Sequence, residues 1–274
     1  MKCIFCKRDS FNSKSVEHIV PESFGNKEHV LPKGFVCDNC NNYFALKIEK
    51  PVFDIEFFNN LRFRNSIENK KRKHPKGKVL IPIAKQVGIV NIDKTNDIEI
   101  ILEKEAFDLI QSGKIKQIYL PIETDIPKSN QHLSRLLAKI GYEMLALRLI
   151  ENEESHELFV QESQFDPIRE YVRINKKNEN WVYHSRKIYE EDENFFLQNG
   201  KAVDMIFECD FLVTKDFEIY FVLAIKGFEF VINLAGSSID GFNDWLKDND
   251  NISPLYIKGK HFGYNLTPNF LIDK

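Results

Sequence analysis

Two Cys-x-x-Cys pairs near the start of the chain constrain its fold more than any other feature of the sequence. Cys3 and Cys6 form the first pair, and Cys37 and Cys40 form the second after 30 intervening residues. Each pair can make a tight knuckle that presents two thiolates, and two knuckles complete a tetrahedral zinc shell with no open position. A segment of about 50 residues buries too little apolar surface to fold alone. We therefore predict a structural Zn²⁺ held by these four cysteines.

The cysteines also bear on the compartment of the protein. Four of the five lie in the two pairs, and in a reducing cell such pairs hold metal more often than they form disulfides. No apolar run reaches transmembrane length, and the first residues lack the apolar region of a signal peptide. With 274 residues, of which 43% are apolar, the chain can bury a core and is expected to hold about two domains. We predict a cytoplasmic globular protein with no membrane contact.

The segment between the knuckles predicts a small β-β-α finger. Residues 16–20 look like a short strand stopped by Pro21, and residues 34–37 look like a second strand that enters the second knuckle. A helical pattern follows from Asn41 and is expected to stop at Pro51. Closure of this finger around zinc would bring an acid, a histidine and two amides together. These residues are Glu17, His18, Asn41 and Asn42.

At these positions the sequence resembles the HNH endonuclease family of ββα-metal nucleases, in its form with two Cys-x-x-Cys pairs. The resemblance covers residues 1 to 55. It is carried by Cys3-x-x-Cys6, by Glu17-His18-Ile19-Val20-Pro21 and by Val36-Cys37-Asp38-Asn39-Cys40-Asn41-Asn42. The combination is specific, because a Glu-His-Ile-Val-Pro string framed by two knuckles at this separation is unusual. The resemblance implies a metal-dependent nuclease that acts on DNA.

The resemblance also implies a role for each matching residue. His18 corresponds to the general base, Glu17 to the acid that binds the catalytic metal, and Asn41 to the last ligand position, with Asn42 as a close competitor. The family's middle Asn falls near Leu31-Pro32, where no amide is present. Asn26 and His29 are the candidates to replace it.

Physical chemistry independently agrees with these roles. Hydrolysis of a phosphodiester needs an in-line water, a base with a pKa near neutrality, and a cation that stabilises the developing charge. Histidine supplies such a base, and carboxylate and amide oxygens suit Mg²⁺ or Mn²⁺. Adjacent residues of a regular strand point to opposite faces, so Glu17 and His18 can share a site only where the backbone is irregular.

The charge of the chain is unevenly distributed. Residues 1–78 carry a net charge of +7 and residues 79–274 one of −10, which together give −3. Much of the positive charge lies in a connector over residues 56–78. Its candidate phosphate contacts are Arg62, Arg64, Lys70, Lys71, Arg72 and Lys73. The competing interpretation is a solvated linker.

The remaining residues, 79–274, predict a mixed α+β domain. Strands are expected over 79–83, 87–92 and 97–102, with a short helix over 103–112 and a long one over 129–152. An antiparallel sheet is expected from 181–188, 203–213, 217–225 and 228–234, with a covering helix over 239–246. This part contains no second catalytic constellation. The candidate roles of residues 79–274 are regulation, target recognition, and oligomerisation through a homodimer or a protein partner.

The sequence thus predicts an α+β protein in three parts: a zinc-stabilised HNH finger over 1–55, a basic connector over 56–78, and an α+β domain over 79–274. Its predicted activity is metal-dependent hydrolysis of DNA, and the resemblance suggests bacterial anti-phage defence or restriction as the setting. The alternative is a non-catalytic zinc adaptor that binds nucleic acid or a protein partner. Such an adaptor needs the four cysteines but tolerates any exposed Glu-His pair.

Overall fold

A computed structural model describes residues 1–82, 85–92, 97–175, 180–193, 195–196, 202–256 and 271–272. The chain forms two compact units. Unit 1 contains residues 1–21, 26–52 and 126–274, and unit 2 contains residues 22–25 and 53–125. The N-terminal segment with the cysteines therefore shares a compact unit with the C-terminal half of the chain. The predicted functional division into residues 1–55, 56–78 and 79–274 stays a prediction.

A helix follows the second knuckle and continues further than the sequence indicates. It begins as α1 (Asp38–Phe44), passes through the π-helix η2 (Ala45–Glu49) and continues as α2 (Lys50–Phe53). The predicted stop at Pro51 is wrong. Proline lacks an N–H and its ring crowds the carbonyl four residues earlier, which here lies in the π-helix. There the Lys50 N–H bonds to the Ala45 carbonyl, five residues back, so the wider turn accommodates the proline.

The two strands predicted between the knuckles are replaced by irregular backbone. Residues 16–20 contribute a single antiparallel bridge, from His18 to Val30, and residues 34–37 form a turn and bend. A further bridge joins Lys2 to Asp9 in the first knuckle. A short 3-10 helix, η1 (Glu22–Phe24), lies between these segments. The strand predictions failed because the segment is held by isolated hydrogen bonds rather than by a continuous ladder.

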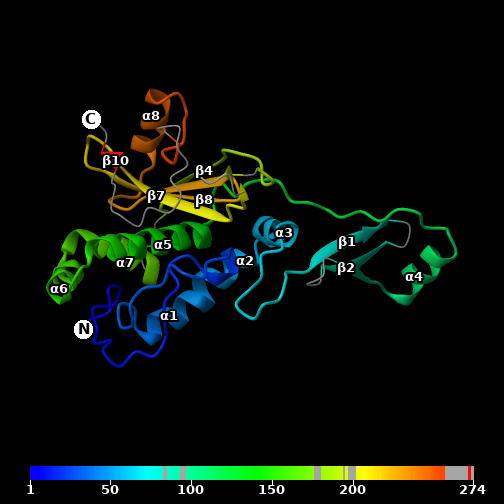
Figure 1. Ribbon diagram of the computed structural model, residues 1–274, viewed down its shortest axis with the longest axis horizontal. Helices are drawn as coiled ribbons and strands as arrows, with labels where there is room; N and C mark the ends of the chain where they lie inside the picture. Colours follow the sequence, from blue (N-terminus) through cyan, green and yellow to red (C-terminus); the bar gives the residue numbers. More distant parts are fainter. Residues whose placement is uncertain are drawn as a thin grey trace. The chain divides into compact units, whose positions relative to one another are not determined.

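The core of unit 1 is a five-stranded sheet in the order β10-β7-β8-β9-β4 (Figure 1). Strands β4 (Tyr183–Lys187), β7 (Phe207–Val213), β8 (Ile219–Ile225) and β9 (Phe228–Asn233) pair antiparallel, and β10 (Leu271–Ile272) runs parallel to β7. The short strands β5 (Phe195–Phe196) and β6 (Ala202–Val203) pair with each other. Helix α8 (Asp240–Asp248) shares a buried apolar cluster with β7, β8 and β9. The antiparallel sheet predicted from the sequence is confirmed.

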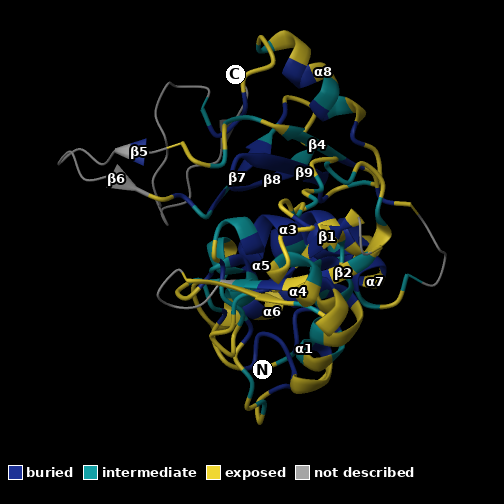
Figure 2. Ribbon diagram, turned by 90° about the vertical axis from the view of Figure 1, so that its right-hand side faces the viewer, coloured by how far each residue is buried: buried dark blue, intermediate teal, exposed yellow. Residues whose placement is uncertain are grey.

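Helix α5 (Gln131–Leu149) packs against β8 and β9. Gly141 permits this close approach, because a Cβ at that position would lie 2.8 Å from Phe221 side-chain atoms. Fourteen consecutive residues of α5, from Leu133 to Ala146, are buried. Figure 2 shows buried residues throughout this helix and the neighbouring strands. Helix α5 is therefore an interior element of unit 1.

Two helices that the sequence did not predict follow α5. Helix α6 (Glu153–Gln161) begins with a capping box between Asn152 and Ser155, and α7 (Asp166–Arg173) follows the 3-10 helix η4 (Ser163–Phe165). Both α6 and α7 pack against α5, and α7 also contacts α1. The C-terminal half of the chain thereby supports the knuckle segment.

Unit 2 is a small α+β body. Its antiparallel sheet, in the order β1-β2-β3, consists of β1 (Gly77–Ile81), β2 (Gln86–Ile92) and β3 (Ile98–Ile101). Helix α3 (Glu56–Arg64) packs on β1 through Phe63, and α4 (Lys104–Gln111) covers a second small core at Ile81. Residue 83, the predicted end of the first strand, lies outside the described residues.

The α+β fold class is confirmed. Helices accompany antiparallel sheets in both units, and the N-terminal segment carries the cysteine cluster. None of the described helices combines the length and apolar character needed to cross a membrane.

Candidate active site and cysteine knuckles

The four predicted zinc ligands converge at one point of unit 1. The sulfur atoms of Cys3, Cys6, Cys37 and Cys40 all lie within 4.8 Å of one another, and Cys6 Sγ is 3.6 Å from Cys37 Sγ. Zn–S bonds of about 2.3 Å in a tetrahedron separate sulfurs by about 3.8 Å. Because four cysteines meet at close to this separation, the cluster fits a closed four-thiolate zinc shell.

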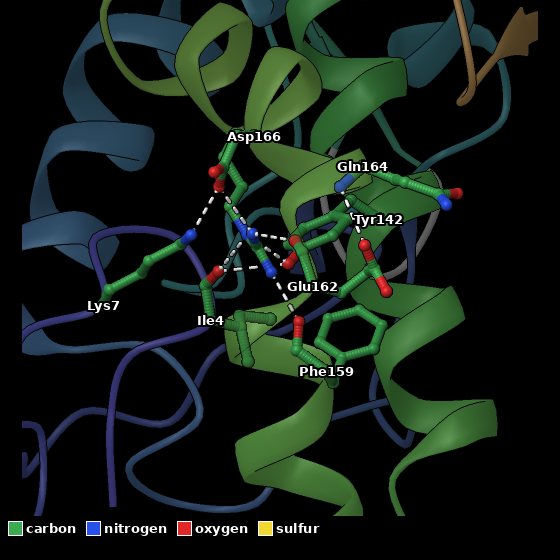
Figure 3. Close-up of polar contacts among 8 residues, drawn as sticks. Ile4, Lys7, Tyr142, Phe159, Glu162, Gln164 and Asp166 are labelled. Atoms are coloured by element: carbon green, nitrogen blue, oxygen red, sulfur yellow. Dashed lines mark hydrogen bonds and ion pairs between the residues drawn. The ribbon is translucent and has the colours of Figure 1, made fainter.

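The first knuckle is anchored by a buried arginine of α7 (Figure 3). Arg169 Nε donates to the Ile4 carbonyl at 3.0 Å and to Tyr142 Oη at 2.7 Å. Its other nitrogens donate to the carbonyls of Phe159 and Glu162 and to the Asp166 carboxylate. Tyr142 Oη also donates to the Ile4 carbonyl, at 3.1 Å. The carbonyl next to Cys3 is therefore held by two residues of the C-terminal half.

Asp166 extends this anchor to the surface. Its carboxylate contacts Lys7 Nζ at 2.6 Å and Arg169 at 2.7 Å (Figure 3). Lys7 directly follows Cys6, and its φ of +60° places it in the left-handed region that a tight knuckle turn uses. The loop of the first knuckle is thus bound to α7 through both backbone and side chain.

His18 lies in an irregular loop that Asn26 holds in shape. The Asn26 amide nitrogen donates to the carbonyls of Val20 and His29 at 2.7 and 2.8 Å, and its oxygen accepts from the N–H groups of Glu28 and His29. Asn26 is 1% exposed, so these bonds are shielded from water. The backbone at Ile19 bonds to His29 O at 3.1 Å, which fixes the position of half-buried His18.

Glu17 directs its carboxylate into the protein. The residue is 5% exposed, and its Oε1 contacts Lys139 Nζ of α5 at 2.5 Å. The same ammonium lies 3.3 Å from Glu49 Oε1 and 3.1 Å from Glu143 Oε2. Three carboxylates from three segments of unit 1 therefore surround one buried lysine.

The charges of this cluster are strongly coupled. Burial by itself lowers the pKa of an ammonium, but the carboxylates of Glu143, Glu17 and Glu49 outweigh it and raise the pKa of Lys139, which stays charged. Burial raises the pKa of Glu143 well above its ordinary value, although Lys139 opposes the shift. Burial also raises the pKa of Glu17, because one ammonium cannot balance three carboxylates of which two are buried.

Lys139, Glu49 and Glu143 were not among the residues predicted from the sequence. A signal was present on α5, because Lys139 and Glu143 stand four residues apart within a buried apolar stretch. A charged pair at this spacing in the middle of a core helix indicates a partner for the charge. Nothing in the sequence identifies Glu17 as that partner, since the contact joins distant parts of the chain.

The two candidate amides, Asn41 and Asn42, lie in α1, the helix that begins in the second knuckle. Asn41 is half-buried and its Nδ2 donates to the Val16 carbonyl at 3.3 Å, directly before Glu17, whereas Asn42 is exposed. The Asp38 carboxylate accepts from the N–H groups of Lys14 and Ser15 and from the Ser15 hydroxyl. The start of α1 and the segment that leads to Glu17 therefore lie side by side.

An open pocket of about 570 Å³ adjoins the cysteine cluster. Its walls come from both knuckles and from α7. They include Cys6, Arg8, Cys37, Cys40, Tyr43 and Arg173. The pocket carries two guanidinium groups beside the thiols.

The six basic residues predicted to meet phosphates differ in accessibility. Lys70, Lys71, Arg72 and Lys73 are exposed on a tight turn, which Asn69 organises by accepting hydrogen bonds from the N–H groups of residues 71 and 73. Arg64 is half-buried. Arg62 is 6% exposed, lies 5.0 Å from the Phe53 ring centroid, and has its pKa lowered to about 10 by burial. The turn at residues 69–73 is called the basic turn below.

Comparison with known proteins identifies the N-terminal segment. The model of the HNH endonuclease family matches residues 3–54, a range that holds the four cysteines, Glu17, His18 and both candidate amides. No curated protein and no solved structure matches the chain. The N-terminal segment of this chain therefore belongs to the HNH endonuclease family.

Proposed function

We propose that this chain is a metal-dependent endonuclease that hydrolyses phosphodiester bonds in DNA. The observation that carries the proposal is the family match over residues 3–54, which includes Glu17-His18 on irregular backbone. A regular strand would point the two side chains to opposite faces, whereas this backbone bends directly after His18. This irregular backbone supports the proposal, because a joint role of the two side chains requires a departure from a regular strand.

In the proposed mechanism His18 removes a proton from the attacking water. A neutral imidazole has the basicity that this step needs near pH 7. Glu17 and Asn41 would hold a Mg²⁺ or Mn²⁺ ion, with exposed Asn42 as the competing amide. Such an ion, when bound, stabilises negative charge on the phosphate and on the leaving oxygen. The four cysteines would hold Zn²⁺ in a closed shell, so they support folding rather than chemistry.

We assign to Asn26 the role of the missing middle Asn. Its four hydrogen bonds join the residues after His18 to the segment that contains His29. An amide can do this because it donates and accepts at once. Asn26 acts as a positioning residue, since it sets the backbone that carries the base. The His29 side chain is not needed for that task.

One observation favours the alternative function, a non-catalytic zinc adaptor for nucleic acid or a protein. The Glu17 carboxylate already contacts the Lys139 ammonium at 2.5 Å, and an ion pair of this kind competes with a metal for the same charge. The adaptor keeps the cysteine knuckles and uses no catalytic ion.

Three further proposals concern the setting. Restriction or anti-phage defence is proposed from the resemblance to HNH proteins that act on foreign DNA. Residues 79–274 are proposed to provide target recognition, regulation, a homodimer contact or a protein partner site. A cytoplasmic location fits a cysteine cluster that holds metal rather than disulfides.

Nicking of supercoiled plasmid by the purified protein tests the proposed activity. We expect nicking with Mg²⁺ or Mn²⁺, and none with EDTA or with His18→Ala. Residual activity of His18→Ala equal to that of the parent would identify a contaminating nuclease. Metal-independent DNA binding without any nicking would favour the adaptor.

A further inference from the structure

The sheet of unit 2 has one covered face and one largely exposed face. On the covered face, Val79, Ile81 and Val90 are at most 5% exposed, because α3 and α4 pack against them. Side chains alternate between the two faces along a strand, so the residues next to these three point to the other side. That other face carries five exposed apolar side chains. They are Leu80 (40% exposed), Val87 (59%), Ile89 (40%), Ile101 (46%) and Tyr119 (53%).

The strand register shows that these five side chains are neighbours. Leu80 is paired directly with Val87 of β2 and, on its other side, with Tyr119. Ile89 is paired directly with Ile101 of β3. Directly paired residues of antiparallel strands share a face, with Cβ atoms about 5 Å apart, and Val87 and Ile89 are successive residues on one face of β2. The five side chains therefore form one continuous apolar patch, called the outer patch below.

Opposite charges border the outer patch on its two sides. Strands β1 and β3 are the edges of this sheet, with β2 between them. The exposed Lys76 and Lys78 lie directly before and on β1, and the exposed Glu99 and Glu103 lie on and after β3. The ammonium of Lys78 is 3.7 Å from the Glu56 carboxylate, but both side chains are more than half exposed, so this pair is weak. A surface with an apolar centre, one basic margin and one acidic margin is complementary to a second copy of itself.

We propose that the outer patch is the contact between two copies of this chain, which form a twofold-symmetric dimer with their patches face to face. Single exposed apolar residues are common on soluble proteins, whereas a continuous patch marks an interaction surface. Two sheets can pack about 10 Å apart with their side chains interdigitated. Such packing removes the five apolar side chains of each copy from water.

The distribution of charge selects the direction of the twofold axis. An axis parallel to the strands places the β1 margin of one copy over the β3 margin of its partner, so that lysines face glutamates. An axis across the strands would place each margin over its own counterpart, and like charges would repel. Three short strands from each copy make a small interface, so the dimer is expected to be weak and to depend on protein concentration.

Sedimentation velocity of the full chain over a concentration series tests the dimer. The measurement needs neither DNA nor added divalent metal, so its outcome is independent of the proposed nuclease activity. The mass should rise from 32.1 kDa toward twice that value as the concentration increases. A parent protein that keeps the monomer mass up to its solubility limit would overturn the inference, and the outer patch would then belong to a different partner.

Val87→Lys and Ile98→Lys form a matched pair of variants. Val87 lies within the outer patch, so a lysine there would bury an unpaired charge and should weaken association at least about 10-fold. Ile98 is also apolar and exposed, at 67%, but alternation from Glu99 places it on the opposite face of the sheet. Ile98→Lys should keep the association of the parent. Equal loss in the two variants would overturn the assignment of the contact to the outer patch.

Charge reversal tests the twofold arrangement itself. Lys78→Glu makes both margins acidic and Glu99→Lys makes both basic, so each variant alone should associate more weakly than the parent. An equimolar mixture of the two should recover association, because each margin then meets its opposite on the other copy. A mixture that associates no better than either variant alone would overturn the arrangement. Both positions are exposed, so this test remains decisive if Val87→Lys fails to fold.

Discussion

Arg169 Nε donates a hydrogen bond to the backbone carbonyl of Ile4, 3.0 Å away and 165 residues earlier in the chain. This bond ties α7 to the residue after Cys3. Because Arg169 is 3% exposed and hydrogen-bonds through all three nitrogens, its loss would leave several buried carbonyls unsatisfied.

Arg169→Met should therefore lower the free energy of unfolding by about 3–5 kcal/mol, as breaking a buried ionic network does. Chemical denaturation followed by fluorescence measures this. Lys247→Met, which breaks an exposed ion pair with Asp244, is the control and should change little. Equal stability of the two variants would show that the Arg169 network contributes nothing.

The purified protein should contain about one zinc ion per chain, because four thiolates make one closed tetrahedral shell. Cys37→Ser should lose the zinc and lower the melting temperature of unit 1 as a whole, since the knuckles share its core with α5 and α7. Elemental analysis and calorimetry check the two outcomes. An ordered, zinc-free parent protein would rule out the metal shell.

His18→Ala and Glu17→Ala should fail in different ways. His18→Ala removes the proton acceptor, so nicking should fall by at least about 100-fold and should not recover with Mn²⁺. Glu17→Ala weakens the ion site, so raised Mn²⁺ should recover part of the activity. Nicking rates of the two variants, measured over a series of Mn²⁺ concentrations, test this difference. If both variants cut DNA like the parent, the adaptor function is favoured.

The basic turn should account for part of the salt dependence of DNA binding. Replacement of Lys70, Lys71, Arg72 and Lys73 by Gln should weaken binding and reduce the slope of log affinity against log salt by about 3–4. Arg62→Met is the contrasting variant: Arg62 is buried, so the change should lower stability and keep the slope. A slope that the fourfold variant leaves unchanged would support a solvated linker.

Unit 1 should lose stability in mild acid through His184. Burial lowers the pKa of this imidazole, which packs against Phe242 and bonds to Asn243. A lowered folded-state pKa adds stability above the ordinary value of 6.5, and that stability is lost as the pH falls through the folded-state pKa. His184→Gln should therefore show a smaller fall in melting temperature between pH 7 and pH 5 than the parent. His132→Gln, at an exposed position on α5, should keep the parental pH dependence; if it does not, His184 is not the responsible group.

Elements of the fold that depend on residue spacing within a short stretch of sequence were predictable. The cysteine spacing indicated the cluster, and the apolar spacing over residues 129–152 indicated α5. The hairpin from β7 to β8 followed from two β-rich runs around Lys215-Asp216. The start of α6 could also have been found, because Asn152 and Ser155 form a capping box.

Other parts depend on contacts between distant residues. The passage of a helix through Pro51 requires a π-helix, which has no sequence signature of its own. The hydrogen bonds of Asn26, on which its proposed role rests, depend on the path of a loop that joins residues 20 and 29. The pairing of Glu17 with Lys139 joins two segments whose proximity follows only from the packing of α5 against the knuckle segment. Patterns within a short window contain no information about such pairings.

The separation of 165 positions between Ile4 and Arg169 also sets the order of events on the ribosome. At about 5–20 residues per second, synthesis of that stretch takes on the order of 10–30 s. Until α5 is made, the nascent N-terminal segment has no Lys139 beside Glu17, and until α7 is made it has no Arg169 beside Ile4. Truncated chains released by interrupted translation before α5 therefore lack both anchors. Only polypeptides that extend through α7 can form both the Lys139–Glu17 contact and the Arg169–Ile4 contact.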